Sequence, residues 1–397
     1  MSLLARIARR IQAEKEKSAL SIPEQQLEAG VPEERVYVAS QLQLMWWRFR
    51  KHRLAMVGTT VIAIFYLLAI FCEFLAPYDP NAFERRYTFV PPQSIHFFHE
   101  GQFHLRPFIY GLKRTRDAET YIITYEPDLE KRYPIYFFVK GDPYKMWGLF
   151  ESDRHLFGLD PAADTDGLRI HLMGTDRLGR DMFSRLLYGS RISLSIGLIG
   201  VFLSFVIGIL MGGISGYFGG VIDLLIQRLI EFLRSIPTIP LWMALSAALP
   251  RDWSSVQRYF AIVVLLSLIG WTGLARVVRG RFLAVREEEY VMAAKLINAS
   301  ELRVILRHML PSFMSYIVAS LTLAIPGMIL GETSLSFLGL GLRPPTISWG
   351  VLLQEAQNLQ TVALAPWLLY PAFFVVAAIL SFNFMGDGLR DAADPYA

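Results

Sequence analysis

The chain has 397 residues, of which 53% are hydrophobic, and its mean hydropathy of +0.36 excludes an ordinary soluble domain. The formal charge of +4 does not indicate nucleic-acid binding, because the basic residues concentrate beside apolar segments, as membrane topology requires. Cys72 is the single cysteine, which excludes an intrachain disulfide and a thiolate metal cluster.

Residues 1–53 form the first predicted region, a cytosolic amphipathic segment followed by a linker. Residues 1–20 place apolar and basic side chains on opposite helical faces, so we expect a helix on the cytosolic membrane surface, with a solvated tail as the alternative. Residues 46–53 combine two tryptophans with arginine and lysine, which is typical of a membrane interface. The apolar run at 54–76 is therefore the first predicted span, with its N-terminus inside.

Residues 77–191 contain no segment that we expect to span a bilayer, and they form a predicted extracytoplasmic insertion. Runs at 120–126 and 131–142 are rich in strand-forming residues, and the Glu100-Gly101 pair indicates a turn, so the insertion is β-rich. Three histidines lie in the turn region without the spacing of a zinc site, and we interpret them as part of an aromatic surface: His96, His99 and His104.

The insertion ends in the polar segment HLMGTDRLGRDMFSRLLYG at 171–189. Thr175 and Asp176 can cap a helix start, and the charged side chains that follow can pair with one another. From the residues alone, this is a structured extracytoplasmic loop.

Residues 192–384 form the predicted membrane core, followed by a cytosolic tail at 385–397. The remaining spans are predicted at these approximate ranges: 194–213, 221–249, 259–274, 312–330 and 364–384. The third span carries four charges in its first half, which we expect to face the bundle interior or the cytosol, with a proton relay as the alternative. Pro237 and Pro240 predict a kink in it.

A densely charged loop at 276–308 interrupts the core, and its excess of arginine and lysine places it in the cytosol. Its sequence predicts a short helix over 290–297, ended by Asn298, which tolerates the left-handed conformation. Ser300 is the predicted N-cap of a second helix. Ala293 and Ala294 keep the first helix thin enough to enter a groove on another protein.

The segment YVMAAKLINAS in this loop resembles the EAA coupling loop of ABC importer permeases. Two positions depart from the pattern, with Met292 in place of a glutamate and Asn298 in place of a glycine. The segments at 171–194, 331–353 and 382–395 resemble the dipeptide/oligopeptide permease family. This resemblance implies an all-α polytopic membrane protein with six transmembrane helices of the type I ABC importer (MetI-like) fold and a β-rich extracytoplasmic insertion.

The same resemblance implies a permease subunit that moves di- and oligopeptides across the bacterial inner membrane by alternating access, with both termini cytosolic. The implied partners are a second permease subunit, two cytosolic ABC ATPase subunits that hold ATP and magnesium, and an extracytoplasmic substrate-binding protein, in addition to the lipid bilayer. No phosphate-binding G-x-x-x-x-G-K-[ST] motif occurs in the chain, so it cannot bind ATP by that route, and we expect the energy to come from elsewhere. We expect the insertion to contact the binding protein or the partner permease, because interfaces favour aromatic residues.

Two groups of site residues follow from the resemblance, and neither includes a catalytic residue or a metal ligand. The residues implied to couple to the ATPase are Tyr290, Val291, Ala293, Ala294, Asn298, Ala299 and Ser300. The residues implied to have structural roles in the family motifs are Gly174, Thr175, Asp176, Gly179, Arg180, Asp181, Glu332, Pro344, Pro345, Trp349 and Gly350. The segment at 331–353 cannot be one continuous helix, and we expect it to edge the translocation path or to lie laterally at the interface.

Three other functions remain as alternatives. The same machinery could import oligosaccharides. An ion-coupled secondary transporter would need buried mid-membrane acids in two related halves, and a membrane-bound enzyme would need a catalytic constellation in one region. An ATPase assay with and without added ATP-binding subunits would distinguish an importer subunit from the last two.

Overall fold

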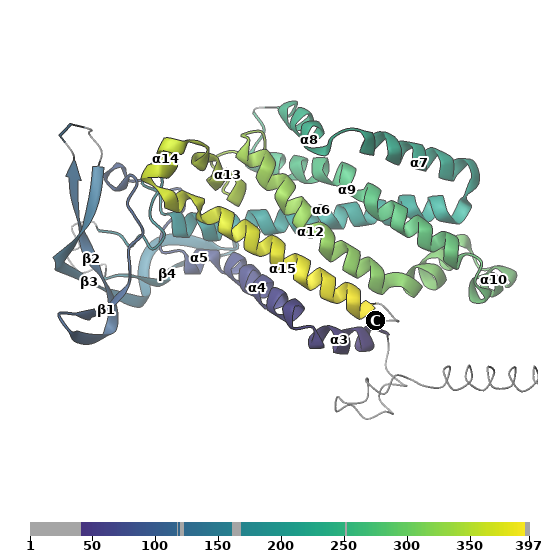
Figure 1. Cartoon of the computed structure of the whole chain (residues 1–397), viewed down its shortest axis with the longest axis horizontal. Coiled ribbons are helices and arrows are strands. Elements are labelled where there is room, and N and C mark those ends of the chain that lie inside the picture. Colours follow the sequence, from purple (N-terminus) through teal and green to yellow (C-terminus); the bar gives the residue numbers. More distant parts are fainter. Residues whose placement is uncertain (1–40, 117, 120–122, 161–167, 251, 394–397) are drawn as a thin grey trace, which may run out of the picture.

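The computed structural model describes residues 41–116, 118–119, 123–160, 168–250 and 252–393. The predicted amphipathic helix at 1–20 and linker at 21–40 lie outside these residues. The molecule is an elongated bundle of helices with a small β-sheet at one end and the short helix α10 (Glu289–Leu296) at the other (Figure 1).

Within the described residues, five helical stretches are long and apolar enough to cross a membrane: 53–70, 182–218, 255–285, 301–337 and 366–393. Their main helices are α4 (Arg53–Ile70), α6 (Met182–Phe218), α9 (Ser255–Val285), α12 (Met314–Phe337) and α15 (Tyr370–Ala393). Helix α6 packs along α9, α12 packs along α15, and α15 packs along α4. The largest buried cluster joins them and includes Ile262, Leu266, Ile329 and Trp349. The prediction of a polytopic helical protein is therefore confirmed.

The span predicted at 221–249 is two helices rather than one, so the count of six spans is not confirmed. Helix α7 (Gly220–Ser235) ends at Ile236, whose extended conformation suits the residue before a proline, and α8 (Thr238–Ala247) begins after Pro237. The charged first half faces the bundle in part, because Asp223 accepts two hydrogen bonds of 2.5 Å from the Arg279 guanidinium of α9.

Four helices extend beyond their predicted spans, because charged residues end an apolar window without ending a helix. Helix α9 continues to Val285, so residues 276–285 of the predicted loop are helical. Helix α6 begins at Met182, so residues 182–191 are helical and not part of a loop. Helix α12 continues to Phe337, and α15 continues to Ala393, nine residues past the expected end at 384. Before α12, the chain runs through α11 (Glu301–Arg303), a π-helical turn (Val304–Met309) and a 3-10 turn that contains Pro311, which has no N–H to donate.

The remaining short helices lie near the ends of the bundle. Helix α3 (Gln41–Lys51) precedes α4 and packs against α15, and α5 (Cys72–Leu75) follows α4 after a break at Phe71. Helices α13 (Trp349–Gln354) and α14 (Leu359–Leu364) lie between α12 and α15 with 3-10 turns at Glu355–Gln357 and Pro366–Leu369. Another 3-10 turn spans Arg85–Tyr87.

The insertion is the β-rich domain that the sequence predicts. Its strands are β1 (His96–His99), β2 (Gln102–Arg116), β3 (Ile123–Met146) and β4 (Phe150–Leu159), paired antiparallel in that order. The predicted turn at Glu100-Gly101 is present, with φ of 47° and 79°. The predicted runs at 120–126 and 131–142 belong to one strand, β3, from residue 123 onward, and residues 120–122 lie outside the described residues. The expected break between the two runs is an irregularity where Gly111 pairs with Asp128 but Tyr110 pairs with Arg132.

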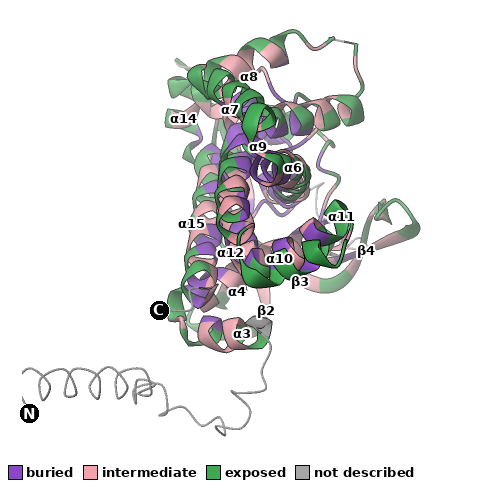
Figure 2. Ribbon diagram, turned by 90° about the vertical axis from the view of Figure 1, so that its right-hand side faces the viewer, coloured by how far each residue is buried: buried purple, intermediate pink, exposed green. Residues whose placement is uncertain are grey.

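The sheet has a small core of its own, formed by Ile109, Ile135 and Ile170. His96 and His99 pack against the ring of Tyr110, as expected for an aromatic surface. Seen along the long axis from the α10 end, the ribbon of β3 and β4 extends sideways beyond the helices (Figure 2). The sheet is thus a separate layer at one end of the bundle.

Candidate functional site

Helix α10 is fixed to the end of the bundle by the two residues of its inner face. Val291 is fully buried and Ala294 is 3% exposed, and both belong to a cluster that includes Phe282 of α9 and Ile317 of α12. On the neighbouring side, the Lys295 ammonium lies 5.3 Å from the centre of the Tyr217 ring of α6. Helix α10 therefore packs mainly on the π-helical turn Val304–Met309, and the buried cluster that it joins extends to α9 and α12.

The end of α10 has the conformation that the sequence predicts. Asn298 is left-handed with a φ of 58°, its N–H donates to Lys295 O over 2.9 Å, and the Ala299 N–H donates to Ala294 O over 3.1 Å. This pattern is a Schellman motif, in which two otherwise free carbonyl groups gain donors. Ser300 is the N-cap residue of α11, although its side chain makes no capping hydrogen bond. The turn thus sets a fixed angle between α10 and α11.

The outer face of α10 is apolar and exposed. Tyr290 is 43% exposed and Met292 is 47% exposed. Ala293 is also exposed and lies between them around the helix. Sequence reasoning missed the two most exposed large apolar side chains of this segment, Leu296 at 84% and Ile297 at 80%. The sequence feature that could have identified them is a pair of adjacent apolar residues at the end of a predicted helix in a highly charged loop. We call Tyr290, Met292, Ala293, Leu296 and Ile297 the α10 surface.

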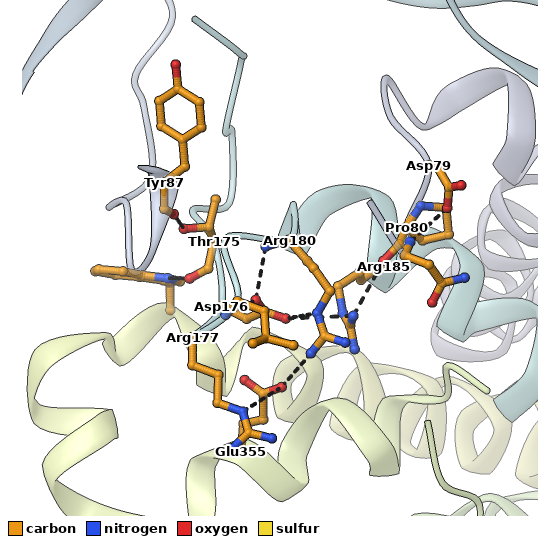
Figure 3. A network of polar contacts seen from close by, with 12 residues as sticks. Asp79, Pro80, Tyr87, Thr175, Asp176, Arg177, Arg180, Arg185 and Glu355 are labelled. Carbon is orange, nitrogen blue, oxygen red and sulfur yellow. Dashed lines mark hydrogen bonds and ion pairs between the residues drawn. The ribbon is translucent and has the colours of Figure 1, made fainter. Parts of the chain in front are cut away.

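At the sheet end of the bundle, the Asp176 carboxylate organises the polar segment before α6 (Figure 3). Its Oδ1 accepts from the backbone N–H groups of Leu178 (2.8 Å) and Arg180 (3.0 Å), and its Oδ2 accepts from Arg180 Nε at 2.6 Å. Arg180 Nη2 also donates to Glu355 Oε1 at 2.8 Å. Burial is the main cause that raises the pKa of the Glu355 carboxyl, and the nearby Asp176 carboxylate raises it further. The positive charge of Arg180 lowers this pKa but does not offset the other two effects. This network joins the start of α6 to the turn after α13.

The predicted helix cap in this segment is wrong by several residues, because Asp181 and not Thr175 or Asp176 caps α6. Asp181 Oδ2 accepts from both the N–H and the hydroxyl of Ser184, each at 2.8 Å, and its Oδ1 lies 3.1 Å from His171 Nδ1. Thr175 instead bridges backbones, since its hydroxyl donates to Tyr87 O and accepts from Val90 N.

Two glycines let the loop before α6 fold this closely. Gly174 has a φ of 74°, and a Cβ there would lie 2.7 Å from the indole of Trp367. Gly179 has a φ of 76°, and a Cβ would lie 2.0 Å from Glu84 O. All six candidate residues between 174 and 181 therefore belong to one packed turn.

A second network centres on Glu332, which is fully buried within α12 and not in the loop after it. Its carboxylate accepts from three serine hydroxyls: Ser336 at 2.8 Å, Ser348 at 2.7 Å and Ser193 at 3.3 Å. Each serine oxygen in turn accepts a backbone N–H, from Leu342, Val351 and Trp349 respectively. Glu332 thus ties α6 and α13 to α12.

The other candidate residues complete this second site. The fully buried Trp349 donates from Nε1 to Leu186 O of α6 at 3.3 Å, and a Cβ at Gly350 would lie 2.8 Å from atoms of Thr333 and Ser336. Helix α13 consequently lies directly on α12. Pro344 and Pro345, joined by a cis peptide bond, lie in the connection between α12 and α13.

A cavity of about 420 Å³ lies among α6, α8, α9 and α12. Its lining is mostly apolar, with Ser204, Thr238 and Ser320 as hydroxyl donors. Trp242 also lines it, and its indole N–H has no hydrogen-bond partner among the described residues. At Gly273 and Gly327 an added Cβ would meet no atom within 4 Å.

The described residues contain no group of three or more His, Cys, Asp or Glu side chains that could hold a metal ion. An exposed apolar surface on α10 lies at one end of the bundle, two buried carboxylate networks lie toward the other, and long helices connect them.

Two family models match the sequence. Residues 204–396 match the binding-protein-dependent transport system inner membrane component, and residues 40–92 match the N-terminal transmembrane domain of oligopeptide transport permease C. The chain is 32% identical to the dipeptide transport system permease protein DppC of Lactococcus lactis over 366 residues, which cover 90% of this chain and 91% of that one. The DppC of Bacillus subtilis is 41% identical over 239 residues, which cover 60% and 70% respectively.

A solved structure of the MetNI methionine ABC transporter in an inward-facing conformation is also similar. It is 18% identical and has a TM-score of 0.42, with 54% of this chain and 98% of that chain covered. The identity and coverage of the curated relatives decide the assignment: the chain belongs to the dipeptide/oligopeptide permease family of ABC importers.

Proposed function

We propose that the chain is the transmembrane permease subunit of a binding-protein-dependent ABC importer that carries di- and oligopeptides by alternating access. The observation that carries the proposal is the α10 surface, an exposed apolar face on a rigidly held helix at the end opposite the sheet (Figure 1). A cytosolic ATPase that binds there would act on the π-helical turn Val304–Met309, because α10 packs against that turn, which leads into α12. The shared buried cluster and the Lys295–Tyr217 contact would carry the force to α9 and α6.

The partners in this proposal are a second permease subunit, two ATPase subunits that hold ATP and magnesium, and an extracytoplasmic binding protein. The end with α10 is cytosolic, since its loop carries the excess of arginine and lysine. Helix α3 and the end of α15 lie toward the same end, so both termini are cytosolic and the sheet is extracytoplasmic (Figure 1).

The cavity beside α9 is our candidate for this subunit's share of the translocation path. Its apolar lining with a few hydroxyl groups suits peptides of varied side chain. Peptide cargo is supported by the names of the relatives, which include dipeptide and oligopeptide permeases and the glutathione permease GsiD of Pectobacterium atrosepticum.

The substitution Ala293→Arg tests the docking role. A close contact on a small residue cannot admit a long cation, and overpacking costs about 1 to 3 kcal/mol, with a further cost if the charge is left unpaired. We expect the variant to fold and insert but to lose co-purifying ATPase subunits, transport, and ATP hydrolysis stimulated by loaded binding protein. Ala363→Arg, at an exposed alanine of α14, is the control and should retain all three. Full assembly and transport by Ala293→Arg would contradict the proposal.

A further inference from the structure

The tip of the β3–β4 hairpin is an exposed apolar point. Trp147 is 47% exposed, Leu149 is 75% exposed and Phe150 is 62% exposed. Trp147 and Gly148 have φ of 53° and 73°, so the turn is tight and left-handed and presents its neighbours outward. The cross-strand pair just before the tip is charged, with Lys145 Nζ 2.9 Å from Glu151 Oε1. The exposed apolar tip is thus bordered by a charged pair.

The tip is fastened to the end of a predicted membrane span. Trp147 Nε1 donates to the carbonyl oxygen of Ile70, the last residue of α4, at 2.8 Å. The Trp147 ring lies 6.1 Å from the ring of Phe71, and its backbone N–H donates to Glu73 Oε1 at 3.2 Å. The height of the tip along α4 is therefore fixed.

At that height α4 ends and an ion pair lies beside it. Arg191 of α6 donates to both carboxylate oxygens of Glu73, at 2.6 and 2.5 Å, and to the carbonyls of Ala69 and Ile70. An ion pair at the end of an apolar helix marks the boundary between hydrocarbon and headgroups, and tryptophan is enriched at that boundary.

The outer surface of α4 leads directly to the tip. Ile64, Leu67 and Ile70 are three residues apart and are 49%, 54% and 44% exposed, so they form one outward stripe along the helix. The stripe ends at Trp147. Figure 2 shows that the β3 and β4 ribbon extends sideways past the helices.

We propose that residues 147–150 lie in the headgroup region of the bilayer beside α4 and hold the sheet domain against the membrane surface. We choose the bilayer as the occupant for two reasons. The tip continues the exposed apolar stripe of α4, and it lies beside the Glu73–Arg191 ion pair at the end of that helix. A protein surface, such as the partner permease, is the competing occupant, and the experiment below separates the two.

Single cysteines with nitroxide spin labels would test this in the assembled importer, reconstituted in liposomes with cysteine-free partner subunits. The native Cys72 is fully buried, and the unsubstituted chain checks that it takes no label. The test variants are Leu149→Cys and Phe150→Cys. Leu67→Cys on α4 is the bilayer control, and Leu105→Cys on β2, where the leucine is 87% exposed, is the aqueous control. Both test positions are exposed, so labelling leaves the fold intact.

The measurement is collision of each label with oxygen, which concentrates in the bilayer, and with a nickel chelate, which stays in water. We expect the oxygen-to-nickel ratio at Leu149 and Phe150 to lie well above that at Leu105 and to approach that at Leu67. A ratio equal to that at Leu105 would show a tip in water and overturn the proposal. Low collision rates with both reagents would show a tip buried against protein and would overturn it equally.

Discussion

Replacement of Asp176 by asparagine should destabilise the sheet end of the molecule severely. The carboxylate is 1% exposed, and its Oδ2 is the acceptor for Arg180 Nε at 2.6 Å, with Arg185 Nη1 at 3.7 Å. The asparagine oxygen can still accept the two backbone N–H groups at Oδ1. Its amide nitrogen, however, would present hydrogen atoms to the Arg180 donor.

The magnitude follows from burial. The side chains of Arg180 and Arg185 are only 10% and 3% exposed, so water cannot replace the lost negative charge. Removal of one partner of a buried ion pair costs about 3 to 5 kcal/mol, because the remaining charge is left uncompensated. Glu355, which also bonds Arg180, is only a partial substitute, since it already uses that contact in the native protein.

Cys72 supplies the assay. It is the only cysteine in the chain and is fully buried, so its reaction with a fluorogenic maleimide in detergent reports opening of the structure around α5. We expect Asp176→Asn to react faster and to unfold at a lower temperature than the native chain. Asp153→Asn is the control, because that carboxylate is 47% exposed and pairs with Lys140 across 3.4 Å at the surface, which is worth about 0 to 1 kcal/mol. Equal reactivity of the two variants would refute the reasoning.

Three further outcomes are expected. Glu332→Leu should lower the unfolding temperature more than Glu332→Gln. The glutamine amide keeps an oxygen acceptor for the buried serines, whereas leucine leaves all three serine hydroxyls without an acceptor. Each unsatisfied hydroxyl costs about 1 to 3 kcal/mol. Gly273→Leu should fill the cavity and reduce uptake of peptides with bulky side chains. Gly280→Leu is the control, because Gly280 also lies on α9 beside open space but does not line the cavity, and this variant should transport normally. Equal uptake by both variants would show that the cavity is not part of the translocation path. Reporter fusions at Gln257 and Asn298 should score outside and inside respectively, and the reverse result would overturn the topology.

Features set by local chemistry could be predicted from the sequence. Asn298 ends α10 in the left-handed conformation, and the Glu100-Gly101 turn forms, because each depends on the backbone preference of one or two residues. The apolar spans are found because their length is fixed by the bilayer. The β-rich character of the insertion also follows from composition.

Features set by contacts distant in the sequence could not be predicted. Asp181 caps α6, whereas Asp176 binds arginine side chains. Both aspartates lie in the same polar segment, and the local sequence does not show which of them caps the helix. Glu332 reads as a loop residue because nothing local shows that Ser193 and Ser348 surround it. Leu296 and Ile297 read as ordinary helix residues, since exposure depends on how the loop folds back on the bundle.

The length of α6 has a mechanical consequence. Its 37 residues contain no proline or break, so the helix is a single rod of about 55 Å from Met182 to Phe218. One end touches α10 through Tyr217, and the other is clamped by Asp181 into the turn that Asp176 organises. A tilt of about 5° of this rod, pivoted at one end, would move the other end by roughly 5 Å, about one helical turn. A small rotation imposed beneath the membrane would therefore be magnified at the opposite face, with no hinge needed along the way.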